Sequence, residues 1–113
     1  MAYKSEEQKT YATDVDYLGT LSNVNDYCDT NNRYNAYLIK CTVGNTVTVS
    51  QIITKRMLND GLENVYTFYT YESPTVNAAI KIGMYEGGRI SLFAKTVTGW
   101  QSSSLRAIIY GIK

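Results

Sequence analysis

Few residues of this chain could carry out covalent or acid–base chemistry. It contains no histidine, the side chain that most often serves as a general base. No serine lies in a Ser-x-x-Lys or Gly-x-Ser-x-Gly arrangement that would activate it as a nucleophile. Paired carboxylates could still hydrolyse a glycoside, and the candidates are Asp14, Asp16, Asp26 and Asp29. Short acidic side chains more often cap helices and shape turns, so we expect a protein that is not an enzyme.

Metal and phosphate sites also lack their usual donors, and we expect no cofactor. Cys28 and Cys41 are the only cysteines, which is half of a zinc site when histidine is absent. The acidic residues do not follow the spacing of an EF-hand, and no glycine pair precedes a Lys-Ser/Thr as in a phosphate-binding loop. The two cysteines allow one disulfide or none. The apolar run 37–43 around Cys41 favours a packed thiol.

Recognition by aromatic side chains fits the composition better than catalysis does. The chain has eleven tyrosines against two phenylalanines and one tryptophan, and tyrosine combines a flat apolar face with a polar tip. The candidate ligand-binding residues are Trp100, Tyr85, Arg89, Tyr66 and Tyr71.

Each candidate also has a purely structural interpretation. Trp100 lies between Gly99 and a run of Gln and Ser, where it could stack on a sugar ring or close one end of the fold. Tyr85 and Arg89 flank a glycine turn and could project together or simply be solvated. Alternation places Tyr66, Phe68 and Thr70 on one face of their strand and Tyr69 and Tyr71 on the other, so one face belongs to the core and the other is free to be exposed.

The elements that position these residues are predicted most clearly from residue 34 onward. Alternating apolar residues and turn signals indicate strands at 37–43, 46–53, 64–72, 80–84, 90–94 and 105–112. Gly44-Asn45 suits a two-residue hairpin turn, and Pro74 ends the aromatic strand. Six strands at this spacing predict an all-β fold, an antiparallel β-sandwich or barrel. The apolar last strand must be covered, either in the centre of a sheet or in an oligomer interface.

The N-terminal third, residues 1–33, gives a weaker pattern, and we expect a mixed segment. Ser5 and Gln8 have the spacing of a capping box, which predicts a short helix there. Apolar residues from Tyr11 to Val24 recur every three or four positions, but threonines and a glycine weaken the helical pattern. The polar stretch 23–32 indicates a loop, and 55–63 indicates a polar connector.

Size and charge restrict the possible partners. The 113 residues fit a single domain, 44% hydrophobic and 19% charged. The formal net charge is +1, whereas nucleic-acid binding needs clustered basic residues; Lys55-Arg56 is the only concentrated basic pair. No apolar stretch is long enough to cross a bilayer, and the polar N-terminus predicts no signal peptide. We expect no nucleic acid and no membrane insertion.

The order of several segments resembles the knob domain of phage tail fibres and pyocin-type tail proteins. The segments are residues 18–27 (LGTLSNVNDY), 34–37 (YNAY), 47–54 (VTVSQIIT), 66–69 (YTFY) and 98–102 (TGWQS). The chain departs from the family pattern at Arg33, where a glycine is expected, and it lacks a second closing tryptophan.

The resemblance implies a function and a location. It implies a virion protein made in the host cytoplasm, a non-catalytic receptor-binding module at a fibre tip or tail that binds bacterial surface carbohydrate as a homotrimer. The alternative is a purely structural fibre or trimerisation component that binds no ligand.

Overall fold

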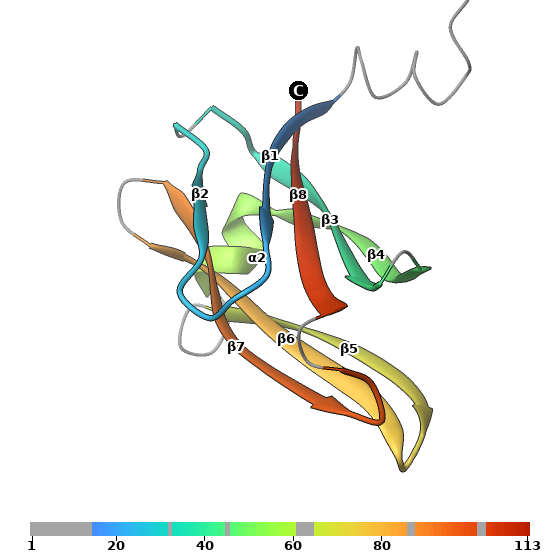
Figure 1. The fold of residues 1–113 in the computed structure, drawn as a ribbon. Helices are drawn as coiled ribbons and strands as arrows, with labels where there is room; N and C mark the ends of the chain where they lie inside the picture. Colours follow the sequence, from blue (N-terminus) through green and yellow to red (C-terminus); the bar gives the residue numbers. More distant parts are fainter. Residues whose placement is uncertain (1–14, 32, 45, 61–64, 86–87, 102–103) are drawn as a thin grey trace, which may run out of the picture.

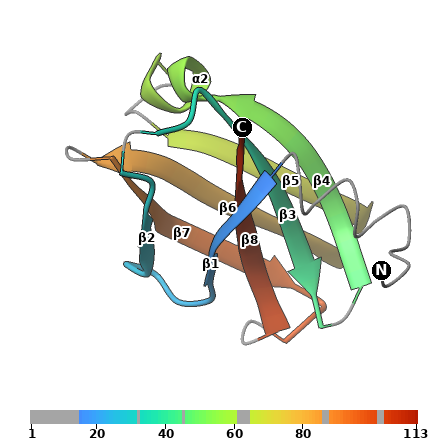
Figure 2. The same ribbon diagram turned by 90° about the horizontal axis from the view of Figure 1, so that it is seen from above.

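The chain folds into two antiparallel sheets that face each other (Figures 1 and 2). The computed structural model describes residues 15–31, 33–44, 46–60, 65–85, 88–101 and 104–113. The first sheet has the strand order β1 (Val15–Leu21), β8 (Leu105–Ile112), β3 (Ala36–Val43) and β4 (Thr46–Thr54). The second has the order β2 (Tyr27–Asp29), β7 (Arg89–Thr98), β6 (Val76–Tyr85) and β5 (Val65–Ser73). The all-β antiparallel sandwich is therefore confirmed.

The six strands predicted from alternation are all present. Val43 pairs with Thr46, and Gly44 between them has a φ of 61°, the left-handed conformation that a tight hairpin turn requires. The aromatic strand β5 ends at Ser73, and Pro74 lies in the turn before β6. The apolar last strand β8 lies between β1 and β3, which is the central position that the sequence allowed for it.

The predicted count of six strands was too low, because the N-terminal third adds β1 and β2 within the described residues. The spacing that suggested a helix there belongs to a strand with a bulge: the pairing of β1 with β8 shifts between Tyr17 and Gly19. An extra residue in a strand breaks the period of two on which strand recognition depends. The short helix predicted from Ser5 lies outside the described residues.

The polar connector predicted at 55–63 was also wrong, since a helix, α2 (Lys55–Asp60), follows β4 directly. The Thr54 side-chain oxygen accepts a hydrogen bond from the Met57 backbone N–H at 3.1 Å, which caps the first turn. Leu58 is completely buried and anchors the helix to the core. In the described part of the chain no helix is long and apolar enough to span a bilayer.

The core lies between the two sheets, and every strand contributes to it. Its members include Leu21, Cys28, Tyr37, Ile39, Ile53, Phe68, Ile80, Ile82, Ile90, Leu92, Leu105 and Ile109, all buried. Burying a side chain of this size stabilises the fold by about 1.5–3 kcal/mol. This core holds the two sheets against each other, with their outer faces on opposite sides of the sandwich.

Both cysteines belong to this core and form no disulfide. Cys28 lies on β2 and Cys41 on β3, in different sheets. Burial raises the pKa of the Cys28 thiol to about 11 and that of Cys41 to about 12. Since the thiolate is the reactive form, both residues act as small apolar side chains.

Candidate functional site

The outer face of the sheet β2-β7-β6-β5 carries three exposed tyrosines, and we call this surface the tyrosine face. Tyr27 on β2 is 53% exposed, and Tyr69 and Tyr71 on β5 are 58% and 56% exposed. On β5 the predicted alternation is confirmed: Phe68 is buried, whereas its neighbours Thr67 and Tyr69 are exposed. Large aromatic rings are thus held in solvent on rigid strands.

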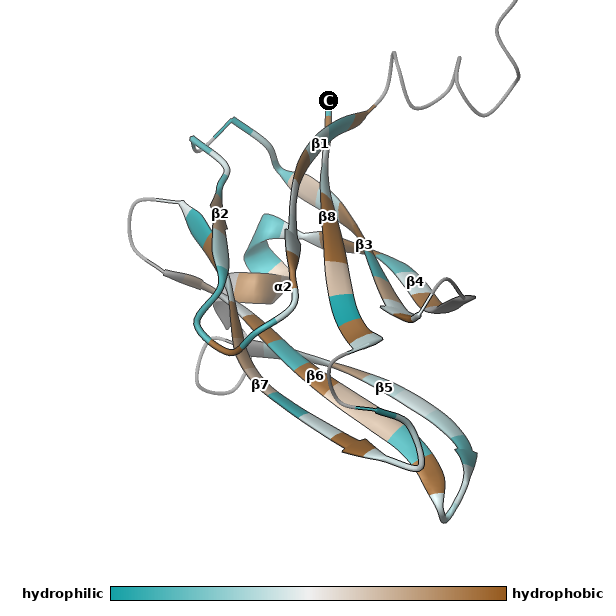
Figure 3. Ribbon diagram, viewed as in Figure 1, coloured by the Kyte–Doolittle hydropathy of each residue, from teal (hydrophilic) through white to brown (hydrophobic). Residues whose placement is uncertain are grey.

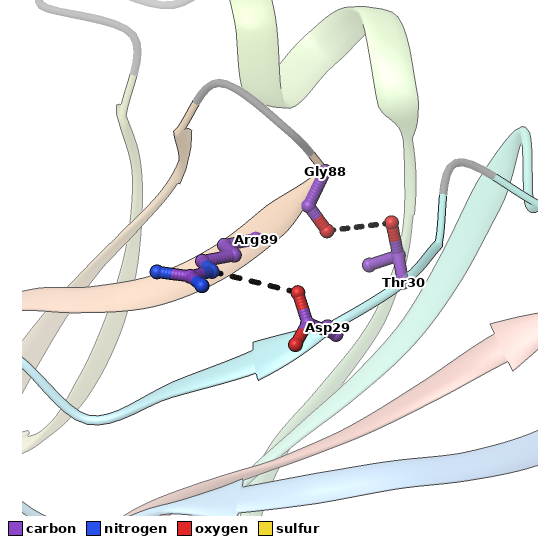
Figure 4. Close-up of polar contacts among 4 residues, drawn as sticks. All are labelled: Asp29, Thr30, Gly88 and Arg89. Carbon is purple, nitrogen blue, oxygen red and sulfur yellow. Dashed lines mark hydrogen bonds and ion pairs between the residues drawn. The ribbon is translucent and has the colours of Figure 1, made fainter.

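At one corner of the tyrosine face, Arg89 is fixed between an aromatic ring and a carboxylate. Its guanidinium carbon lies 4.6 Å from the centroid of the Tyr27 ring, and its Nε lies 3.5 Å from Asp29 Oδ1 (Figure 4). Both charged side chains remain about half exposed, at 51% and 54%. The guanidinium has further N–H donors, so this corner offers a ring face, donors and an acceptor to a ligand.

Hydrogen bonds from a neighbouring residue stabilise the β2–β7 pairing that brings Asp29 beside Arg89. The two residues pair directly across the strands. Next to them, the Thr30 hydroxyl donates a 2.7 Å hydrogen bond to the Gly88 carbonyl (Figure 4), and the Thr30 backbone N–H donates to the same oxygen at 2.9 Å. Because Thr30 is buried, these bonds fix the corner from below.

At the opposite edge, Tyr69 and Tyr71 stack on each other. Their ring centroids are 6.2 Å apart and the ring planes differ by 21°. Their pairing partners on β6 are small: Ala79 opposite Tyr69 and Asn77 opposite Tyr71. Neither neighbour is large enough to cover the rings, so both rings of the stacked pair remain exposed.

Small and polar residues separate the two aromatic groups. Tyr27 pairs with Ser91, which pairs with Gly83, and Lys81 lies one row further along, exposed, between Thr67 and Ala94. Tyr27 and Tyr69 are three strands and two rows apart, which corresponds to roughly 20 Å at ordinary sheet spacings. The tyrosine face therefore holds two separate stacking positions, and the residues between them are small or polar.

The structure places two of the five predicted ligand-binding residues on this sheet surface and two elsewhere. Tyr71 and Arg89 lie on the tyrosine face. Tyr85 pairs with Arg89 in the backbone, but its side chain lies outside the described part. Tyr66 is half-buried against the core, 5.1 Å from the Phe68 ring, and its hydroxyl accepts a hydrogen bond from Gln51 Nε2 at 2.9 Å.

Trp100 is half-buried and packs against the core, the contact that an end-closing role requires. It follows Gly99, whose Cα lies so close to the β5–β6 turn that an added Cβ would be 2.3 Å from the Thr75 carbonyl oxygen. The backbone of Trp100 thus leaves the sheet at the end where Tyr71 lies.

The aspartates that suggested paired-carboxylate chemistry have structural partners where they are described. Asp26 Oδ2 accepts hydrogen bonds from the backbone N–H groups of Ser22 and Asn23 at 3.0 and 2.8 Å, and these lower the pKa of its carboxyl group. Asp16 accepts a 2.6 Å hydrogen bond from the Tyr34 hydroxyl, which is the main reason its pKa is lowered. Asp14 lies outside the described residues.

Metal binding finds no support in the described segments, where no group of three or more His, Cys, Asp or Glu side chains could hold an ion.

Comparisons with protein-family models, curated proteins and solved structures give no match. The function must therefore be inferred from the surfaces of the molecule itself.

Sequence reasoning missed three residues of the tyrosine face. Tyr69 could have been found, because alternation places it beside Tyr71 and opposite to Tyr66. Tyr27 and Asp29 could not, because they lie in the polar stretch that indicated a loop, and their partner Arg89 is distant in the sequence.

Proposed function

We propose that this protein is a non-catalytic adhesion module that binds carbohydrate on the tyrosine face. The observation that carries the proposal is the stacked pair of Tyr69 and Tyr71, held exposed on an edge strand without bulky neighbours. The apolar face of a sugar ring packs on such a surface, and tyrosine hydroxyls supply hydrogen bonds at its rim. Such a surface is also expensive to leave in water, because each exposed ring forgoes the free energy of burial.

The corner formed by Tyr27, Asp29 and Arg89 supports the same class of ligand. Arg89, Asp29 and Tyr27 present donors, an acceptor and a ring within one small area. Sugar hydroxyls both donate and accept hydrogen bonds, so a mixed set of this kind suits them better than a surface of one charge. With two stacking positions on one sheet, the ligand would be an extended glycan or two separate sugar residues.

The assignment to a phage or virion fibre, and with it a bacterial surface glycan, comes from the sequence resemblance and forms the wider part of the proposal. Assembly of several copies belongs to it as well. A purely structural fibre component remains the second candidate, favoured by the apolar outer face of the other sheet, described below.

Binding to a panel of bacterial surface glycans tests the proposal. Tyr71→Ala should weaken binding by up to about tenfold, the value of one aromatic contact, whereas Tyr71→Phe should retain most of the affinity because it keeps the ring. Tyr17→Ala is the matched control, since Tyr17 is similarly exposed, at 62%, but lies on β1 in the other sheet. Folded wild-type protein that binds neither the panel nor intact cells would favour the purely structural alternative.

A further inference from the structure

The outer face of the other sheet, β1-β8-β3-β4, carries two successive rows of paired residues that are mostly apolar, bordered by a third row that is polar except for Ile108, and we call it the apolar face. In the strand order β1, β8, β3, β4 the rows are Val15, Ile112, Ala36 and Thr54; Tyr17, Tyr110, Leu38 and Ile52; and Thr20, Ile108, Lys40 and Ser50. An antiparallel sheet with one side in water normally carries polar residues there.

The central strand shows most clearly that both sides of this sheet are apolar (Figure 3). Burial alternates along β8: Ala107 and Ile109 face the core, whereas Ile108 and Tyr110 are only half-buried on the other side. On the edge strands Tyr17 is 62% and Ile52 61% exposed. Strands that are apolar on both sides are typical of sheets covered on both sides, so this face is suited to a partner.

Charge on the apolar face is almost absent. Lys40 is the one charged residue in the three rows, and its Nζ lies 5.4 Å from the centroid of the Tyr110 ring. Tyr110 in turn contacts Tyr17 edge to face, with 5.8 Å between ring centroids. A strongly charged partner would find no complementary charges here, whereas a second apolar surface of the same kind fits.

We propose that this face binds a second copy of the chain, sheet against sheet, about a two-fold axis. An axis along the row of Tyr17, Tyr110, Leu38 and Ile52 brings each strand over its own counterpart. It also lays the row containing Lys40 against the partner's row of Val15, Ile112, Ala36 and Thr54. The two lysines are thereby kept apart, at opposite ends of the contact.

The area of the face agrees with a weak dimer. Four strands at about 4.8 Å spacing and the five residues that the three rows span, rising about 3.3 Å each, make a face of roughly 19 by 17 Å, about 320 Å² per copy. Two copies then cover about 640 Å² of flat area, and more once side-chain relief is counted, which places the contact at the small end of specific associations. The dimer is independent of the proposed carbohydrate binding and differs from the trimer that the resemblance implies.

Light scattering of the purified chain at about 100 µM should give a mass twice the monomer's 12.7 kDa. Ile52→Glu and Tyr17→Glu should each weaken the dimer by about a hundredfold or more, because each places a carboxylate in an apolar contact. Both residues are exposed in one copy, so the variants should fold, which circular dichroism checks. Tyr69→Glu, similarly exposed on the other sheet, is the matched control and should leave the dimer intact.

Two variants at opposite edges also distinguish a face contact from edge pairing. If β4 paired with its counterpart edge to edge, Ile52→Glu could disrupt the dimer while Tyr17→Glu, on β1, would not. That result would overturn the proposal, as would a monomeric or trimeric wild type.

Discussion

Tyrosine has three different roles in this molecule, and only one of them bears on recognition. Tyr69 and Tyr71 expose their rings. Tyr34 and Tyr66 pack their rings inward and use their hydroxyls to bind Asp16 and Gln51. Tyr37 is fully buried, and its ring packs edge to face against that of Tyr34, with 6.2 Å between the ring centroids. Counting tyrosines therefore overstates the size of a binding surface, and their exposure must be known.

Two aspartates should make the stability of the protein depend on pH in acid. The pKa values of Asp16 and Asp26 are lowered in the folded state by the Tyr34 hydroxyl and by backbone N–H groups respectively. A carboxyl group with a lowered pKa stabilises the fold above its unfolded pKa and loses this effect as the pH falls through the folded value. The loss should therefore begin near pH 4 and continue below it.

Urea unfolding at several pH values between about 7 and 2.5 measures this effect. Asp26→Asn keeps an acceptor oxygen but removes the titration. It should be less stable than the wild type at neutral pH, and the two should converge in acid. Asp16→Asn should behave in the same way. Parallel loss of stability in the wild type and both variants would show that other groups control the acid response.

The elements differ in how well the sequence predicted them, and the reason is periodicity. Burial alternates without interruption over all eight residues of β8 and over the first six of β3, and the bounds of both strands were predicted almost to the residue. The bulge in β1, the three residues of β2 and the six of α2 leave too few regular positions for any period to appear. Their existence depends on tertiary contacts, such as the burial of Cys28 and Leu58.

The same limit applies to the candidate site. Alternation within β5 predicts which tyrosines share a face. The corner of Tyr27, Asp29 and Arg89 depends on the pairing of β2 with β7, a long-range contact that local spacing does not determine. A site assembled across strands is thus predictable only in the parts that one strand supplies alone.

Substitutions at two turn glycines allow the cost of a strained backbone to be measured apart from the cost of a steric clash. Gly44 and Gly99 both have positive φ, 61° and 85°. A Cβ at Gly44 would meet no atom within 4 Å, whereas at Gly99 it would be 2.3 Å from the Thr75 carbonyl oxygen and 2.8 Å from Val76 Cγ2. Asparagine tolerates positive φ better than other side chains, so Gly44→Asn should cost less than about 1 kcal/mol. Gly99→Asn should cost about 3 kcal/mol, since the β5–β6 turn has to move.

Urea denaturation of the two variants measures the difference. The Gly99 substitution should also alter the fluorescence of Trp100, the only tryptophan, because the displaced turn changes its contact with the core. Equal losses of stability at the two positions would contradict the close approach at Gly99.

At the scale of the whole molecule, the two outer faces of the sandwich point in opposite directions, and we propose different partners for them. If the apolar face joins two copies, the two tyrosine faces point away from each other, on the outside of a four-layered assembly. Avidity requires that both sites engage one ligand array at once and is lost when geometry forbids it. The dimer should therefore gain little on a single flat glycan surface and should instead bridge two surfaces.

Glycan-coated beads distinguish these behaviours. The wild type should agglutinate the beads, whereas Ile52→Glu should bind a single immobilised glycan layer as well as the wild type but fail to agglutinate, because it keeps the tyrosine face and loses the second copy. Tyr71→Ala should weaken binding to the layer and agglutination together while remaining dimeric. If Ile52→Glu lost much of its affinity for the flat layer, the two tyrosine faces would have to point the same way, and the face-to-face arrangement of the two copies would be wrong even if the dimer itself existed.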